Sequence, residues 1–174
     1  MRIKLPLILI AGIGSLLLSS CKTSETMDQK VEKLLSQLTL EEKISLIHGN
    51  TYFTTPAIPR LGIPALHLSD GPCGVREEND PDSWNSANWT NDATAYFPAL
   101  TSLASSWNPE LAAEFGYAYS EEAIARGKDI MLAPGLNIHR TPLNGRNWEY
   151  MSEDPFLTSR FAVSFIKAAQ SKGI

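Results

Sequence analysis

Asp70 and a group of charged residues between positions 139 and 154 are the side chains best placed to do chemistry. Asp70 follows a short apolar run and precedes Gly71 and Pro72, which force a turn and fix the carboxylate at the end of a strand. A carboxylate in that place could accept hydrogen bonds from two neighbouring hydroxyls of a ligand. It could equally cap its own turn by accepting from backbone amides. Spacing alone does not separate these two interpretations.

Three arginines accompany this carboxylate. Arg76 lies six residues after Asp70 in the same loop, where it could keep the carboxylate ionised and oriented or simply face solvent. Arg146 follows Gly145, which lets the backbone turn close to a pocket, and a guanidinium can bind two oxygens of one ligand at once. Arg140 is as well suited to an ion pair with a loop carboxylate as to binding a ligand.

Glu149, Glu153 and Asp154 look like a cluster of catalytic acids, since paired carboxylates can work as acid and base. A structural interpretation fits them better. Asp154 precedes Pro155 as an N-cap residue does, and Glu153 adds negative charge at the start of the same helix. His139 is interpreted as a hydrogen-bonded loop residue rather than a base.

Alternating strands and helices must position these side chains. Apolar residues at helical spacing begin at Asp28, and Thr39 with Glu42 forms a predicted capping box for a second helix. Further helices are predicted to begin at Asn108-Pro109 and at Asp154-Pro155, and strands are predicted over 65–68, 96–98 and 130–133. This order predicts an α/β fold with βαβ units and a parallel sheet.

Two segments carry a resemblance to a known family. The stretch from Leu132 to Pro155, with Asn144-Gly145-Arg146 and Ser152-Glu153-Asp154-Pro155, and the stretch Leu68 to Arg76 resemble signature motifs of family 3 glycoside hydrolases, the β-glucosidase type. The resemblance covers residues 28–174. It implies the N-terminal part of a (β/α)8 TIM-type barrel, truncated after about three strands.

The resemblance also implies roles. Asp70, Arg76 and Arg146 would bind the sugar in subsite −1. The whole enzyme would be a retaining, exo-acting hydrolase of terminal β-linked, glucose-type sugars on oligosaccharides or glycosides, without a cofactor. Its nucleophile and its acid/base are expected downstream of Ile174, so no catalytic residue is predicted within this chain and the chain alone is expected to be inactive. The alternative is an inactive truncated lipoprotein remnant with at most sugar binding.

The N-terminal residues are typical of a targeting segment. Arg2 and Lys4 precede an apolar run, and Leu18-Ser-Ser-Cys21 resembles a bacterial lipobox. We therefore expect residues 1–20 to be a signal peptide, Cys21 to be lipidated, 21–27 to be a tether, and the protein to be anchored to a membrane of the cell envelope. The alternative is an ordinary secretory signal with an incidental cysteine.

Composition and motif content bear on which partners and metals the protein could bind. Of 174 residues, 43% are hydrophobic and 20% charged, as in a globular domain, and the net charge is −4. The chain lacks a basic run, so no nucleic-acid partner is expected. It also lacks a metal-binding motif, so we expect no metal. If Cys21 is lipidated, Cys73 has no partner for a disulfide.

Overall fold

The computed structural model describes residues 25–78, 84 and 94–174. The predicted signal peptide and Cys21 lie outside these residues. The chain divides after Ser36 into two compact units. Among the described residues, no helix has the length and apolar character needed to cross a membrane.

The first described element is helix α1 (Met27–Gln37), as the spacing of its apolar residues predicted. Thr26 caps it, because its Oγ1 accepts from the Gln29 amide at 3.2 Å while the Gln29 side chain accepts from the Thr26 amide at 2.9 Å. Val31 and Leu35 on its apolar stripe remain 45% and 41% exposed.

Helix α2 (Leu40–Ser45) begins with the predicted capping box. Thr39 Oγ1 accepts from the Glu42 amide at 3.2 Å, and Glu42 Oε2 accepts from the Thr39 amide at 2.8 Å. Arg60, in the short 3-10 helix η1 (Pro59–Leu61), donates from Nε to Glu42 Oε1 at 2.7 Å. The cap therefore also fastens the turn-rich segment that leads to the sheet.

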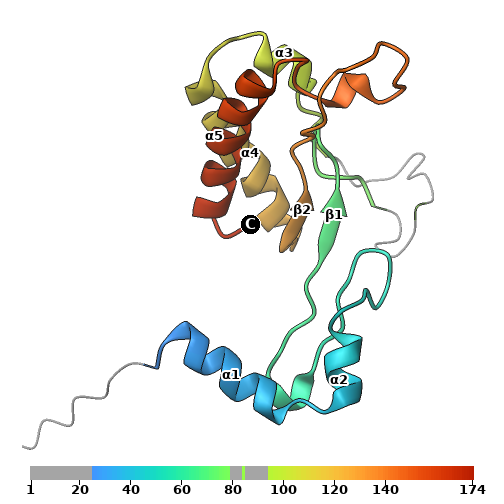
Figure 1. Ribbon diagram of the computed structural model, residues 1–174, viewed down its shortest axis with the longest axis vertical. Helices are drawn as coiled ribbons and strands as arrows, with labels where there is room; N and C mark the ends of the chain where they lie inside the picture. Colours follow the sequence, from blue (N-terminus) through green and yellow to red (C-terminus); the bar gives the residue numbers. More distant parts are fainter. Residues whose placement is uncertain (1–24, 79–83, 85–93) are drawn as a thin grey trace, which may run out of the picture. The chain divides into compact units, whose positions relative to one another are not determined.

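The sheet of the second unit pairs β1 (Leu68–Asp70) with β2 (Ile130–Leu132) in parallel, with Asp70 opposite Leu132 (Figure 1). The first predicted strand thus lies three residues later than expected. The strand predicted over 96–98 is wrong. The Phe97 amide donates to the Cys73 carbonyl at 2.8 Å in an irregular loop, and Pro98 has no amide to extend a ladder.

Two long helices, α4 (Pro109–Ala125) and α5 (Pro155–Ser171), pack against each other beside this sheet (Figure 1). Asn108 Oδ1 accepts from the Glu110 amide at 3.0 Å, and Asp154 Oδ1 accepts from the Phe156 amide at 2.8 Å. The capping interpretation of Asp154 is confirmed. The helices meet at Gly116, where an added Cβ would lie 2.5 Å from the Phe165 carbonyl oxygen.

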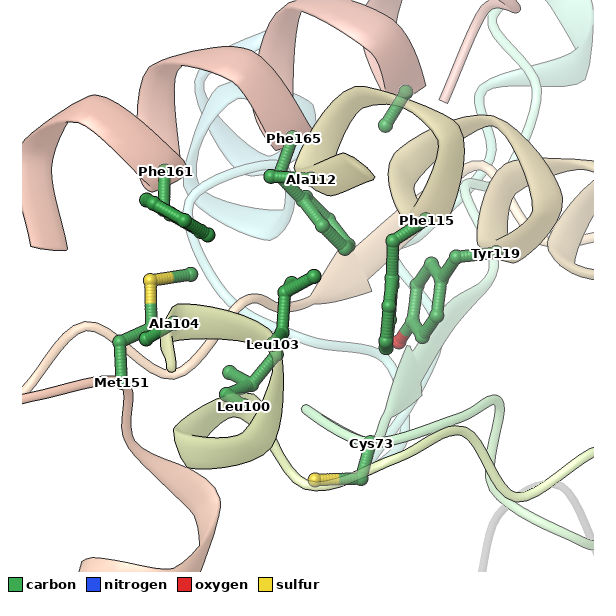
Figure 2. Close-up of a cluster of buried hydrophobic side chains, with 11 residues drawn as sticks. Cys73, Leu100, Leu103, Ala104, Ala112, Phe115, Tyr119, Met151, Phe161 and Phe165 are labelled. Atoms are coloured by element: carbon green, nitrogen blue, oxygen red, sulfur yellow. The ribbon is translucent and has the colours of Figure 1, made fainter. Parts of the chain in front are cut away.

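A short helix that the sequence did not predict, α3 (Leu100–Ala104), completes the core. Figure 2 shows its apolar side chains facing those of α4 and α5. Tyr119 is fully buried, with its ring centroid 5.8 Å from that of Phe97 and 5.5 Å from that of Phe165.

The expected α/β class is confirmed, while the expected barrel is not evident. Within the described ranges the sheet consists of β1 and β2 alone, against the three strands expected. The structure therefore provides one βαβ arrangement, whose strand ends carry the loops described next.

Candidate functional site

A hollow of about 450 Å³ lies where β1 ends and its following loop begins. Asp70, the last residue of β1, lines it together with residues that come from three separate loops. These residues include Cys73, Arg76, Tyr96, Trp148 and Glu149. One of the three predicted site residues is thus a strand-end carboxylate that faces a cavity.

The turn after Asp70 is held rigidly. Gly71 has a φ of 137°, and a Cβ there would lie 1.8 Å from the Gly74 carbonyl oxygen, so only glycine fits. The Tyr119 hydroxyl donates to the Gly71 carbonyl, and the Arg76 amide donates to the Asp70 carbonyl at 3.1 Å. In the described part of the chain no amide donates to the Asp70 carboxylate, so its oxygens are available to a ligand rather than capping the turn.

Arg76 lines the same hollow, but its guanidinium is engaged by other groups. Its central carbon lies 4.1 Å from the centroid of the Phe53 ring and 5.7 Å from that of Trp84. Its Nη2 lies 3.6 Å from Glu78, which also accepts from Lys128 Nζ at 2.7 and 2.8 Å. Arg76 is linked to Asp70 through the backbone, and this network fixes the loop.

Arg146 comes from a different loop, just before the short 3-10 helix η2 (Asn147–Glu149). Its Nε donates to Glu149, whose side chain is 4% exposed, while that of Arg146 is 67% exposed. This hydrogen bond, followed by the charges of Glu149 and, more weakly, Asp70, raises the pKa of Arg146. Glu149 is therefore the buried partner of an arginine, consistent with a structural rather than an acid-catalytic role. Arg140 forms no ion pair within the described ranges.

Cys73, Tyr96 and Trp148 are lining residues that the sequence analysis did not assign to the site. Burial raises the pKa of the Cys73 thiol, so it is protonated and poorly nucleophilic near neutral pH. Tyr96 and Trp148 are 74% and 53% exposed, so their rings are accessible at the edge of the hollow. Both Tyr96 and Trp148 are aromatic residues that follow loop-forming stretches of sequence, and this pattern could have pointed to them.

Another hollow, of about 290 Å³, is lined partly by the segment that follows η2. Trp107, His139, Ser152 and Glu153 contribute to its wall. The His139 amide donates to the Ser152 carbonyl at 3.1 Å, which ties the two arms of the long loop together. No group of three or more His, Cys, Asp or Glu residues in the described segments is arranged to hold a metal ion.

Comparison with protein families decides the relationship. The model of the glycosyl hydrolase family 3 N terminal domain matches residues 86–174, about half of the chain. The chain belongs to glycoside hydrolase family 3. The family resemblance drawn from the sequence is thereby confirmed, and the matched residues include the motif from Leu132 to Pro155.

Individual family 3 members match over more of the chain. Beta-glucosidase BoGH3A of Bacteroides ovatus is 52% identical over 151 residues, which are 87% of this chain and 20% of that protein. The thermostable beta-glucosidase B of Acetivibrio thermocellus is 44% identical over 83% of this chain and 19% of its own length. The chain thus spans about a fifth of the curated relatives it matches.

Solved family 3 structures share the fold of this chain. Beta-glucosidase 3B from Thermotoga neapolitana, solved in complex with glucose, has a TM-score of 0.70 at 43% identity, over 83% of this chain and 22% of that one. A beta-glucosidase from Kluyveromyces marxianus, solved in complex with glucose, has a TM-score of 0.72 at 37% identity, over 81% of this chain and 16% of that one. The arrangement of strands and helices described above is therefore that of the family 3 N-terminal domain.

Proposed function

We propose that this chain forms part of the sugar-binding wall of a retaining, exo-acting β-glucosidase that removes terminal β-linked, glucose-type sugars. The observation that carries the proposal is Asp70. Its carboxylate ends a strand, is fixed by a turn that only glycine can make, and faces a hollow of about 450 Å³. It accepts no hydrogen bond from a backbone amide of the residues that the structure describes. The family 3 relatives, two of them solved with glucose, support the substrate class.

Each predicted residue has a role suited to its position. Asp70 accepts hydrogen bonds from two neighbouring hydroxyls of the terminal sugar, which charge-assisted geometry makes strong. Arg146, the partner of the lining residue Glu149, donates to sugar oxygens with the N–H groups that Glu149 does not use. Arg76, held over Phe53, keeps the Asp70 loop in place and adds positive potential to the same wall.

The covalent step requires more than this wall. Retaining hydrolysis uses one carboxylate as a nucleophile and a second carboxylic acid to protonate the leaving group. We assign neither role to a residue of this chain, because Glu149 is paired with Arg146 and Asp154 caps α5. We further propose that Cys21 carries lipid and holds the protein at a membrane of the cell envelope.

Sugar binding by the purified protein tests the proposal. Titration with glucose, followed by NMR or calorimetry, is expected to show binding that Asp70→Asn weakens by about 10- to 100-fold, the loss of one or two charge-assisted hydrogen bonds. Asp28→Asn, an exposed acid of α1, is the matched control and is expected to leave the Kd unchanged. Equal binding by Asp70→Asn and the unchanged protein would refute the assignment of Asp70.

Hydrolysis of an aryl β-glucoside provides the complementary measurement. The 174-residue chain alone is expected to release no phenol from the aryl glucoside, since the two catalytic carboxyl groups are not assigned within it. Turnover that Asp70→Asn abolishes would overturn that expectation and would require a nucleophile among the residues of this chain.

A further inference from the structure

Arg146 and Glu149 form an ion pair of unequal partners. The Glu149 side chain is 4% exposed and lines the same hollow as Asp70, while the Arg146 side chain is 67% exposed. An exposed arginine ordinarily samples many rotamers and loses side-chain entropy when a ligand fixes it. A buried carboxylate that holds one of its N–H groups removes much of that freedom before the ligand arrives.

The backbone of Glu149 is held by several contacts, two of them with residues outside the pair. An added Cβ at Gly135 would lie 2.4 Å from the Glu149 carbonyl oxygen, so the backbone of the β2 end presses directly on this residue. The Glu149 amide donates to the Arg146 carbonyl at 3.2 Å. One residue further on, Thr101 Oγ1 donates to the Tyr150 carbonyl at 2.8 Å, which ties the segment to α3. The backbone that carries Glu149 is therefore held by the segment that follows β2 and by α3.

Charged groups that line the hollow also act on the Arg146 guanidinium. Both Glu149 and Asp70 contribute negative potential at the Arg146 guanidinium and raise its pKa. Arg146 does not itself line the hollow, but its partner Glu149 and the neighbouring Trp148 do. With Nε bonded to Glu149, the two terminal nitrogens of Arg146 remain as donors for a ligand beside this wall.

We propose that Glu149 is a positioning residue: it holds the exposed Arg146 guanidinium in the orientation that binds the sugar, without touching the sugar itself. This inference rests on the proposed function, because the arginine it orients is a proposed sugar ligand. It assigns to Glu149 a specific role other than acid catalysis or helix capping.

A double-mutant cycle on glucose affinity tests it. Glu149→Gln keeps the size of the side chain and removes its charge, so it is expected to raise the Kd by about tenfold. In an Arg146→Ala background the same substitution is expected to change the Kd by less than twofold, since no guanidinium remains to be oriented. Glu121→Gln, which neutralises the exposed partner of Lys172, is the control and leaves affinity unchanged in both backgrounds.

The Arg146 side chain can be observed directly. By NMR, the Arg146 Nε–H is expected to exchange slowly with water in the unchanged protein and at least tenfold faster in Glu149→Gln. Should Glu149→Gln fail to fold, Glu149→Asp keeps the charge on a shorter arm and is expected to show the same faster exchange.

Three outcomes would overturn the proposal or its premise, and they are distinguishable. An equal loss of affinity in both backgrounds means that Glu149 contacts the sugar or acts on the fold, and the positioning role is wrong. Unchanged Nε–H exchange in both glutamate variants means that Glu149 does not restrain Arg146. If the unchanged protein binds no glucose while the exchange result is as expected, the proposed function fails and the restraint of Arg146 remains.

Discussion

Tyr119→Phe removes one oxygen atom from the centre of the fold and tests how α4 supports the Asp70 turn. The Tyr119 hydroxyl donates to the Gly71 carbonyl, one residue after Asp70, and the side chain is fully buried. Phenylalanine keeps the ring contacts with Phe97 and Phe165, so no cavity is created. The substitution therefore isolates the hydrogen bond.

The expected magnitude follows from the burial of the two partners. A typical hydrogen bond contributes about 0.5–1.5 kcal/mol, and a buried carbonyl left without its donor costs about 1–3 kcal/mol. Gly71 is only half-buried, so water can partly replace the lost donor. The free energy of unfolding is expected to fall by about 1–2 kcal/mol, and glucose affinity by a few-fold because the turn that carries Asp70 loosens.

Denaturant unfolding of the purified protein measures this change. Tyr117→Phe is the matched control, since Tyr117 lies on the same helix with 42% of its surface exposed and is expected to tolerate the change within about 0.5 kcal/mol. Equal unfolding midpoints for Tyr119→Phe and Tyr117→Phe would refute the claim that α4 holds the turn through this hydroxyl.

The same residue predicts an alkaline transition. Burial, followed by the charge of Asp70, raises the pKa of Tyr119 above its ordinary value near 10. The folded state therefore favours the neutral phenol. Its contribution to stability is complete below pH 10 and is lost as the pH rises toward the folded-state pKa. In Tyr119→Phe the free energy of unfolding is expected to fall less steeply above pH 10. The same pH dependence in both proteins would contradict this.

Three further predictions concern the rest of the fold. The hydrogen bond from Arg60, and then that from Thr39, lowers the pKa of Glu42 to about 2. The stabilising effect of the ionised Glu42 is therefore complete above pH 4.5 and is lost as the pH falls toward 2. Glu42→Gln should make the free energy of unfolding less dependent on pH in this range, and NMR titration of Glu42 checks the pKa. Gly116→Ala gains about 1 kcal/mol of helix propensity, but it places a Cβ 2.5 Å from the Phe165 carbonyl oxygen, at an overpacking cost of about 1–3 kcal/mol. Denaturant unfolding should therefore show a less stable variant. A more stable variant would contradict the close contact between α4 and α5. Trp107 is 73% exposed at a φ of 52°, so Trp107→Asn should match or raise the melting temperature, with a gain of up to about 1 kcal/mol; a loss of more than that would mean that the indole packs in the folded protein.

The features that the sequence predicted are those with a local cause. The capping box at Thr39, the Asn108 cap of α4 and the Asp154 cap of α5 depend on residues within a few positions of one another. The Asp70 turn was predicted for the same reason, because Gly71 and Pro72 adjoin it.

Features with a tertiary cause were missed or misplaced. Helix α3 is five residues long, too short to show an apolar period, and it exists because Leu100 and Leu103 are buried against α4 and α5. Phe97, predicted to lie in a strand, instead places its ring in that same core. The pairing of Arg146 with Glu149 was visible as an i,i+3 spacing, but only the structure shows that one partner is buried and the other exposed.

The close approach of Gly135 to Glu149 has a consequence for how this loop can vary. The contact closes the base of the segment 136–148, and the His139–Ser152 backbone hydrogen bond closes it a second time. Leu143, at the tip of this loop, is 91% exposed. The two contacts that close the base of the loop do not involve the side chains of its tip. Thr141 and Asn144 are hydrogen-bonded to Asn147, so variation is best tolerated at the exposed Leu143 between them, where a substitution can change the surface of the loop while the backbone of Glu149 keeps its place.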